Sequence, residues 1–476
     1  MAINISEMNK KEKEILIENL YDSLPATINL KNLLGNEVFI KWFLPRVKLI
    51  KEIQRWPQEK IDEIVEIRLR NLLNHLDNHS TFWRTYFSKY VLNLKSTNIF
   101  SELLKLPVVD KTKLIEWDDN VVVKDNNSPT TDYYTSGTTG VPLRVRIDEC
   151  ESIRNELVYM FEPDVFKIQH VGALLRRKFI LLLGRRVPRQ YDPYSEFFPL
   201  DAFSSIGDKN TRQRIYNTIV ENSYIYLFAH SSIILELMKY VREDGTKLPV
   251  IANLSGEAVS FEEERFIYET TGVPITFAYN CKESGKIGAK CSVHIGKNLY
   301  HIYRERVLLE IVDDNGNQLE NDKEGNIILT VLDRTTMPII RYLTGDRGRI
   351  LSRQCSCDRL SPLLELQGRN KDIILLPNGD TFSVLLFRSL FMKEIGLENI
   401  TKYQIIQKTK NFIQIDFISR KNFSSDKLSI VQSTLESVLK NEIKIYIREV
   451  NRIENYPSGK NKVFISLLEI QKSQTI

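Results

Sequence analysis

The most informative segment of the chain is Tyr133-Tyr-Thr-Ser-Gly-Thr-Thr-Gly-Val-Pro142. Four Ser/Thr hydroxyls and two glycines follow one another directly after an aromatic pair. Glycines let the backbone approach a ligand closely, and hydroxyls together with exposed N–H groups surround phosphate oxygens. The segment is not a Walker loop, because no Lys-Ser or Lys-Thr follows its second glycine. It predicts a phosphate-binding loop, with a Ser/Thr/Gly surface turn as the alternative.

Five further segments follow this loop in chain order. They are Ser255-Gly-Glu257, Tyr279-Asn-Cys-Lys-Glu283, Arg341-Tyr-Leu-Thr-Gly-Asp346, Gly368-Arg-Asn-Lys-Asp372 and Tyr456-Pro-Ser-Gly-Lys460. Together with the loop, they resemble the ordered signatures of the adenylate-forming superfamily, which includes acyl-CoA synthetases, peptide-synthetase adenylation domains and luciferases. The chain departs from that pattern at Asn280 and Lys282, where the family has Gly and Thr.

The region before the loop narrows the resemblance to one branch. Three segments resemble the N-terminal region of phenylacetate–CoA ligase-like proteins, which the capsule-biosynthesis adenylating proteins share: Arg68-Leu-Arg-Asn-Leu-Leu-Asn-His75, Phe82-Trp-Arg-Thr-Tyr86 and Leu106-Pro-Val-Val-Asp-Lys-Thr-Lys113. Many superfamily members carry lysine after the proline of the loop, whereas here Leu143 follows Pro142. The absence of lysine at this position is another resemblance to the phenylacetate–CoA ligase-like branch, which often lacks it.

The resemblance implies nucleotide-binding roles for residues of several segments. Those between residues 135 and 140 would hold the β- and γ-phosphates, Asp346 would accept the ribose hydroxyls, and Arg369 would contact ribose or phosphate. The full set is Thr135, Ser136, Gly137, Thr138, Thr139, Gly140, Ser255, Gly256, Glu257, Tyr279, Asn280, Asp346 and Arg369.

Two catalytic residues, Glu283 and Lys460, are implied by the same resemblance. Glu283 offers the hard oxygen ligand that Mg²⁺ prefers. Lys460 would bridge the substrate carboxylate and the α-phosphate when a small domain closes about a hinge at Lys371. Lys282 has two open interpretations: it contacts phosphate, or it pairs with Glu283 and weakens metal binding.

The implied activity is ATP-dependent activation of a small carboxylic acid to an acyl or aryl adenylate, followed by transfer to a thiol. Coenzyme A is the expected acceptor. One alternative is a stand-alone adenylation enzyme that loads the phosphopantetheine of an acyl or peptidyl carrier protein, or forms an amide. Another is a non-catalytic nucleotide-binding interaction protein, which has no physical need to retain Lys460, Asp346 and Arg369 together.

Cysteine spacing predicts a metal site outside these motifs. Cys291-Ser-Val-His294 and Cys355-Ser-Cys357 supply four N/S ligands, the number that suits a structural tetrahedral Zn²⁺. The predicted ligands are Cys291, His294, Cys355 and Cys357, with His301 as the competing nitrogen ligand. Unrelated reduced cysteines are the alternative, and the branch resemblance favours zinc.

The expected fold class is α/β: a large N-terminal α/β domain containing a β subdomain, plus a small mobile α+β C-terminal lid domain. The large AMP-binding domain is predicted at 1–368, with a mostly helical lead-in at 1–105 and the β subdomain at 298–351. A hinge is predicted at 369–372 and the lid at 373–476. Predicted elements include strands at Phe179–Gly184, Val307–Val312 and Pro338–Tyr342 and a helix at Ser425–Leu439.

Composition excludes several protein classes. The chain has 66 Lys and Arg against 61 Asp and Glu, a net charge of +5 with both signs interspersed, so a nucleic-acid partner is not expected. We find no secretory signal or apolar run long enough to cross a membrane, and an odd count of five cysteines indicates a reducing compartment. A cytoplasmic monomer or homodimer is therefore expected.

Overall fold

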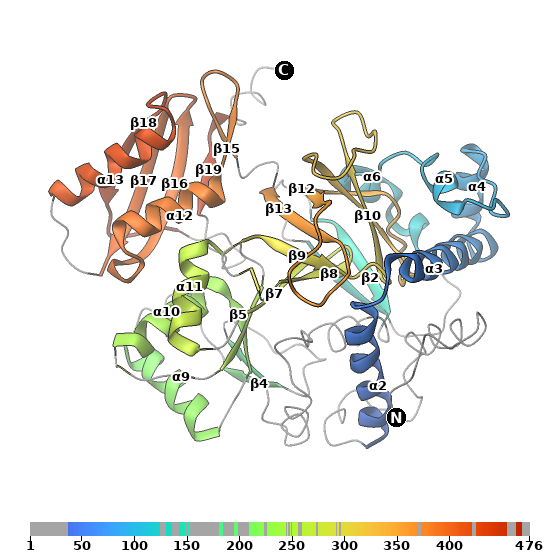
Figure 1. Cartoon of the computed structure of the whole chain (residues 1–476), viewed down its shortest axis with the longest axis horizontal. Coiled ribbons are helices and arrows are strands. Elements are labelled where there is room, and N and C mark those ends of the chain that lie inside the picture. The colour runs from blue at the N-terminus through green and yellow to red at the C-terminus, as the bar shows by residue number, and fades with distance from the viewer. Residues whose placement is uncertain are drawn as a thin grey trace. The chain divides into compact units, whose positions relative to one another are not determined.

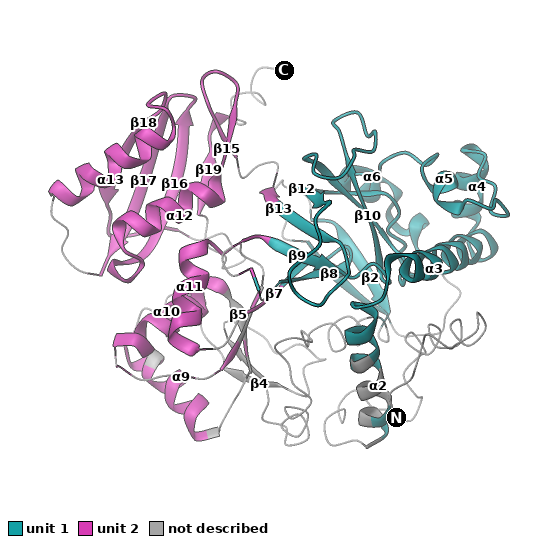
Figure 2. Cartoon of the chain, viewed as in Figure 1, with its two compact units in different colours: residues 1–168, 278–293, 299–366 teal, residues 169–277, 294–298, 367–476 magenta. Residues whose placement is uncertain are grey.

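The computed structural model of the 476-residue chain describes residues 37–468 with gaps (Figure 1). The gaps are 124–129, 136–141, 149–150, 152–179, 184–194, 199–208, 223–225, 244, 246–247, 249, 256–258, 273–274, 292, 295–296, 370–372, 421–424 and 455–462. The chain divides into two compact units (Figure 2). Unit 1 contains residues 1–168, 278–293 and 299–366, and unit 2 contains residues 169–277, 294–298 and 367–476.

Unit 1 begins with helices. They are α2 (Glu37–Ile53), α3 (Gln58–His79), α4 (Thr81–Lys89), α5 (Ile99–Leu103), α6 (Lys111–Trp117) and the 3-10 helix η3 (Asp118–Val121). Helix α3 buries one apolar face, formed by residues such as Ile61, Val65, Leu69 and Leu76, at helical spacing. It ends at Ser80, whose side chain accepts a hydrogen bond from the Trp83 N–H and so begins α4.

The strands of unit 1 are mainly antiparallel. They are β1 (Thr130–Tyr134), β2 (Arg144–Asp148), β7 (Thr276–Cys281), β8 (Gly285–Lys290), β9 (Leu299–Ile302), β10 (Val307–Val312), β11 (Gly325–Val331), β12 (Tyr342–Leu351) and β13 (Leu363–Arg369). Strands β1 and β2 form a separate hairpin, and the others lie in the order β10-β11-β12-β13-β9-β8-β7. Strand β7 begins in unit 2 and continues into unit 1 at Ala278, and β13 continues into unit 2 at Gln367.

The first half of unit 2 alternates strands and helices. Its elements are β3 (Ile180–Leu183), β4 (Ser195–Phe198), α9 (Lys209–Asn222), β5 (Tyr226–His230), α10 (Ser231–Glu243), β6 (Ile251–Ser255) and α11 (Phe261–Thr271). Strands β4, β3, β5 and β6 pair in parallel, as strand–helix alternation predicts. Ser260 and Glu263 form a capping box at the start of α11, and Gly272 ends that helix with a φ of +68°.

The second half of unit 2 is a small α+β assembly. Its elements are β14 (Ile373–Leu375), β15 (Thr381–Ser383), α12 (Val384–Ile395), η6 (Leu397–Asn399), β16 (Ile400–Thr409), β17 (Phe412–Ser419), α13 (Ser425–Val438), β18 (Lys444–Glu449) and β19 (Phe464–Ser466). Four of its strands form a sheet in the order β18-β17-β16-β19. One cluster of buried apolar residues runs from α10 and α11 through α12 to this sheet.

The expected α/β fold class is confirmed, with a small α+β part at the C-terminus. The division into domains stays a prediction: unit 2 joins residues 169–277 to the C-terminal part and resumes at Gln367, two residues before the expected hinge. The predicted strand at Pro338–Tyr342 is wrong, because β12 begins only at Tyr342. Among the described residues, none of the helices has the length and apolar character needed to cross a membrane.

Candidate functional site

The phosphate-loop motif starts where the hairpin of β1 and β2 opens. Thr135, the first of the residues 135–140 that are predicted to hold the phosphates, lies at this point. The Thr135 N–H donates to the Leu143 carbonyl at 2.9 Å, and the Leu143 N–H donates to Thr135 Oγ1 at 3.0 Å. These two bonds bring the ends of the motif together. The predicted ligands Ser136, Gly137, Thr138, Thr139 and Gly140 lie outside the described residues.

Two motif residues that are 67 positions apart, one within β7 and one within β12, contact each other. The buried Tyr279 hydroxyl donates to Asp346 Oδ2 at 2.8 Å. Burial, followed by the Asp346 charge, raises the pKa of Tyr279 well above its usual range, so the phenol stays protonated and donates. Gly345, with a φ of +79° that glycine adopts readily, lies immediately before Asp346 where the pairing of β12 with β11 shifts register.

Glu283 lies in the turn between β7 and β8, where Oε1 of its half-buried carboxylate accepts a hydrogen bond from the Tyr342 hydroxyl at 3.0 Å. Burial and then the Glu283 charge raise the pKa of Tyr342 above its usual range. The two motifs therefore exchange hydrogen bonds: the tyrosine of each donates to the carboxylate of the other. Sequence reasoning missed Tyr342, although its place beside the Thr-Gly-Asp sequence was a usable signal.

Lys282 extends from the same turn toward the phosphate-loop motif. Its Nζ donates to the carbonyl of Tyr134, the residue immediately before Thr135. This contact places the Lys282 ammonium beside the start of the predicted phosphate loop, and the two interpretations of Lys282 stay predictions. Asn280 lies on β7 opposite Lys286 of β8, just after a register shift in that pairing.

The remaining predicted nucleotide ligands are only partly described. Ser255 ends β6, with its backbone opposite His230 of β5, whereas Gly256 and Glu257 lie outside the described residues. Arg369 ends β13 as an exposed residue of unit 2. Lys371 and Lys460 also lie outside the described residues, so the hinge and the catalytic lysine stay predictions.

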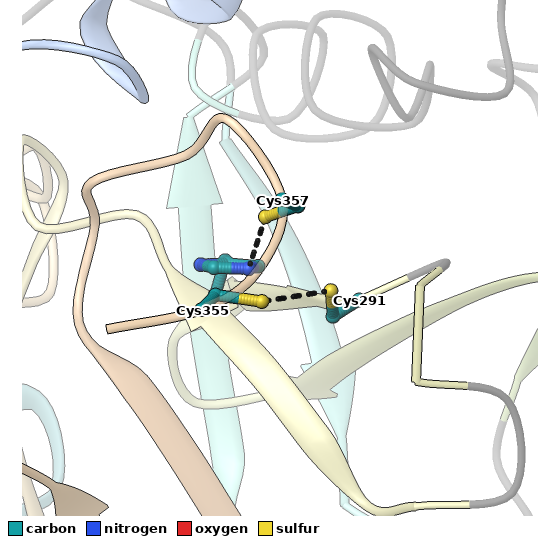
Figure 3. A group of neighbouring side chains, drawn as sticks. Cys291, Cys355 and Cys357 are labelled. Carbon is teal, nitrogen blue, oxygen red and sulfur yellow. Dashed lines mark hydrogen bonds between the residues drawn. The ribbon is translucent and has the colours of Figure 1, made fainter. Parts of the chain in front are cut away.

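Three cysteines and one histidine gather in unit 1 (Figure 3). The ligand atoms of Cys291, His301, Cys355 and Cys357 all lie within 4.8 Å of one another. Cys291 Sγ is 3.4 Å from Cys355 Sγ, and Cys357 Sγ is 3.2 Å from His301 Nε2. His294 is not in this group, so the structure favours His301, the competing candidate, over His294 as the nitrogen ligand.

The surroundings of His301 suit a metal ligand. Its Nδ1 lies 3.1 Å from the Ser361 carbonyl, which fits a tautomer with Nδ1 protonated and donating. That tautomer leaves the Nε2 lone pair facing the cysteines, the arrangement that orients histidines at metal sites. Burial raises the pKa of the Cys357 thiol to about 11 and that of Cys291 still higher in the metal-free protein.

Comparisons with known proteins agree with this architecture. Residues 384–466 match the family model described as the CapK C-terminal domain. The chain is 23% identical to phenylacetate–coenzyme A ligase of Thermus thermophilus over 339 residues, which cover 68% of this chain and 74% of that protein.

Solved structures show the same fold. The crystal structure of 2-hydroxyisobutyryl-CoA ligase in the postadenylation state, in complex with R3-HIB-AMP, is similar with a TM-score of 0.68 and 17% identity, covering 88% of this chain and 92% of that one. The same ligase with 2-HIB-AMP and CoA in the thioesterification state gives a TM-score of 0.53 and 17% identity, covering 88% and 93%. The resemblance carried by the six motifs is thereby confirmed at the level of fold.

Proposed function

Because the chain has the fold of acyl-CoA ligases in the adenylate-forming superfamily, we propose that it is an AMP-forming acid–thiol ligase. It joins a small carboxylic acid to AMP with release of pyrophosphate. It then transfers the acyl group to a thiol, with coenzyme A as the expected acceptor. The observation that carries this proposal is the exchange of hydrogen bonds from Tyr279 to Asp346 and from Tyr342 to Glu283, which joins two nucleotide motifs in one site.

The site residues divide the work of holding ATP. Asp346 keeps one oxygen on the Tyr279 hydroxyl, and its carboxylate has remaining acceptor capacity for the ribose hydroxyls. The hydroxyls and N–H groups of the loop that begins at Thr135 hold the β- and γ-phosphates. The Lys282 ammonium, fixed on the Tyr134 carbonyl, adds positive charge at the start of that loop.

A divalent cation fits the Glu283 position. Its carboxylate is a hard oxygen donor, and the single Tyr342 contact leaves acceptor capacity on both oxygens. Glu283 would hold Mg²⁺, which would supply positive charge that neutralises phosphate oxygens. The protein's part is to orient the carboxylate.

The Cys/His cluster fits a structural zinc ion. Cys291, His301, Cys355 and Cys357 supply the four N/S donors of a closed tetrahedral site, and the Ser361 carbonyl orients the imidazole. With all four positions filled by protein ligands, the ion would stabilise unit 1 and take no part in the reaction.

The proposal is tested by acid-dependent ATP–pyrophosphate exchange across aryl, fatty and amino acids. We expect one acid class to support Mg²⁺-dependent exchange, and coenzyme A then to yield AMP and a thioester in equal amounts. A parallel reaction supplies a phosphopantetheine-bearing carrier protein as acceptor. ATP binding without exchange for any acid would contradict the ligase and favour the non-catalytic nucleotide-binding protein.

Lys460→Ala gives a sharper test of the same chemistry. We expect this variant to bind ATP with nearly unchanged affinity and to lose roughly 100-fold or more of the exchange rate, because a preorganised cation at the α-phosphate is removed. Lys462→Ala, two positions later, is the matched control and should retain exchange. Wild-type exchange by Lys460→Ala would refute the assignment, and loss only in Lys462→Ala would move the role to that residue.

A further inference from the structure

Two fully buried arginines of unit 1 contact the backbone around the turn that contains Glu283. Arg306 and Arg334 are 0% exposed, and each pairs with an equally buried acid. Arg306 Nε lies 3.1 Å from Asp333 Oδ2, and Arg334 Nε lies 2.5 Å from Glu151 Oε1. None of these four residues belongs to the six motifs.

Further donors of both guanidinium groups go to the backbone of this turn and of the start of β8, whereas Arg334 Nη2 has no hydrogen-bond partner among the described residues. Arg334 Nη1 donates to the carbonyl of Glu283 itself. Arg306 Nη2 donates to the Ser284 carbonyl at 2.5 Å, and its Nη1 donates to the Lys286 carbonyl. Three of the four carbonyls from Glu283 to Lys286, two in the turn and one at the start of β8, therefore accept from a buried guanidinium group.

A purely stabilising role explains these ion pairs poorly. Removing two charge pairs from water is costly, and well-packed apolar residues often stabilise a core equally well. What an arginine provides is a rigid planar fork that fixes several acceptors in one geometry. In this case the acceptors all belong to the segment that presents the Glu283 carboxylate.

We propose that Arg306 and Arg334 are positioning residues that fix the backbone of residues 283–286 so that Glu283 holds a metal–nucleotide complex, with Glu151 orienting the Arg334 guanidinium group through a hydrogen bond and Asp333 balancing the charge of Arg306. This proposal rests on the proposed function. The arginines bind the backbone carbonyls of this segment, and the Tyr342 hydroxyl donates to Oε1 of the Glu283 side chain. Because both arginine side chains are fully buried, they would act through the backbone of this segment and not by contact with the substrate.

The test compares Arg334→Lys and Glu151→Gln with the wild type. Lysine retains the charge but cannot reproduce the two-directional fork, and glutamine retains the shape of the acid but not its charge. We expect Arg334→Lys to raise the Mg²⁺ concentration for half-maximal pyrophosphate exchange about tenfold and Glu151→Gln about threefold. The KM for the carboxylic acid should change less than about twofold in both, because only the turn is displaced.

Glu310→Gln is the matched control. It removes the acid partner of Arg341, another buried arginine of unit 1, whose other donors go to the carbonyls of Leu104 and Leu106. We expect a comparable loss of thermal stability with an unchanged Mg²⁺ requirement. If all three variants lower stability and none shifts the Mg²⁺ requirement, the arginines are merely structural and the proposal is overturned.

A binding measurement separates this proposal from the ligase assignment. Calorimetric titration with Mn²⁺·ATP requires no carboxylic acid and is made on the wild type and all three variants. Weaker binding by Arg334→Lys alongside unchanged binding by Glu310→Gln supports the positioning role, even if no acid ever supports exchange. Equal Mn²⁺·ATP affinity in all four proteins, or none in the wild type, overturns it. Should Arg334→Lys fail to fold, Glu151→Gln against Glu310→Gln decides the question.

Discussion

Within unit 1, the Cys/His cluster and the Glu283 turn are two very different places for a cation. In the cluster, four soft donors from Cys291, His301, Cys355 and Cys357 already lie within 4.8 Å of one another. At the turn, Glu283 supplies one hard carboxylate, and buried arginines donate hydrogen bonds to the backbone carbonyls of Glu283 and Ser284. A closed set of donors suits a permanent ion, whereas an open one suits an ion that arrives with its substrate.

The comparison predicts that the two places fail in opposite ways. Damage at the turn should remove catalysis and spare the fold, because the cation there belongs to the nucleotide complex. Damage at the cluster should remove stability and spare the chemical step, because the proposed zinc ion would join distant parts of the chain.

The largest effect is expected from Glu283→Gln. The amide retains the size of the carboxylate and can still contact Tyr342, but it loses the charge that a divalent cation requires. We expect pyrophosphate exchange to fall about 100- to 1000-fold, the range seen when a preorganised electrostatic group is lost. The melting temperature should change by less than about 2 °C. Glu320→Gln, an exposed carboxylate of unit 1, is the control. If the melting temperature of Glu283→Gln fell as far as that expected for a substitution in the Cys/His cluster, the predicted difference between the two cation sites would be contradicted.

The second effect concerns stability. We expect His301→Ala to lose its zinc, measured by metal analysis of the purified protein, and to melt about 5 °C lower, which corresponds to roughly 2 kcal/mol in a unit of this size. Residual exchange at low temperature should stay within about twofold of the wild type, since the hydrogen bonds noted above for Cys291, His301, Cys355 and Cys357 in the described part of the chain do not involve Tyr279, Glu283, Tyr342 or Asp346.

His294→Ala is the matched control for His301→Ala. It should retain one zinc ion per chain and the wild-type melting temperature. If His294→Ala loses the metal and His301→Ala keeps it, the original Cys-x-x-His assignment is restored. Folded wild-type protein without zinc would contradict a structural ion at this cluster.

The smallest effect is expected from Lys282→Thr, which installs the residue usual in the family. Loss of one partly screened cation at the phosphate loop should raise the KM for ATP about fivefold, close to 1 kcal/mol, with a smaller change in kcat. The difference should shrink in high salt. Lys323→Thr, an exposed lysine of the same unit, is the control. An increase in Mg²⁺ affinity in Lys282→Thr would instead support pairing of Lys282 with Glu283.

Local patterns predicted several elements closely. Strand β10 was predicted at its exact bounds, and the helix predicted at Ser425–Leu439 ends one residue earlier as α13. The strand predicted at Phe179–Gly184 corresponds to β3. These segments have regular apolar periodicity and clear turn residues at their ends, so local information suffices.

Strand β12 shows where local information misleads. The apolar run before it is buried as core, but Arg341 has a φ of 45°, which interrupts any strand at that point. The true strand contains Gly348, where a Cβ atom would lie 2.6 Å from the Glu365 carbonyl. Such a close approach of two backbones demands glycine, yet glycine lowers the strand signal in the sequence.

The site was predictable in its members and not in its contacts. The motifs identified Tyr279, Glu283 and Asp346, but which tyrosine meets which carboxylate depends on strand pairing across more than fifty residues. The choice of histidine in the Cys/His cluster depends on strand pairing in the same way. Spacing along the chain favoured His294, whereas antiparallel pairing of β9 with β8 and β13 brings His301 to the cysteines.

The separation of the cluster's ligands along the chain also bears on how unit 1 is made. Cys357 lies 56 residues after His301, and strands β10, β11 and β12 are encoded between them. At a synthesis rate of about 5–20 residues per second, Cys357 leaves the ribosome roughly 3–11 s after His301. Cys355 and Cys357 are thus synthesised well after Cys291 and His301. Until then, only two of the cluster's four proposed ligands have been synthesised. If the cluster binds zinc as proposed, the complete four-ligand site can therefore form only after these three strands have been synthesised.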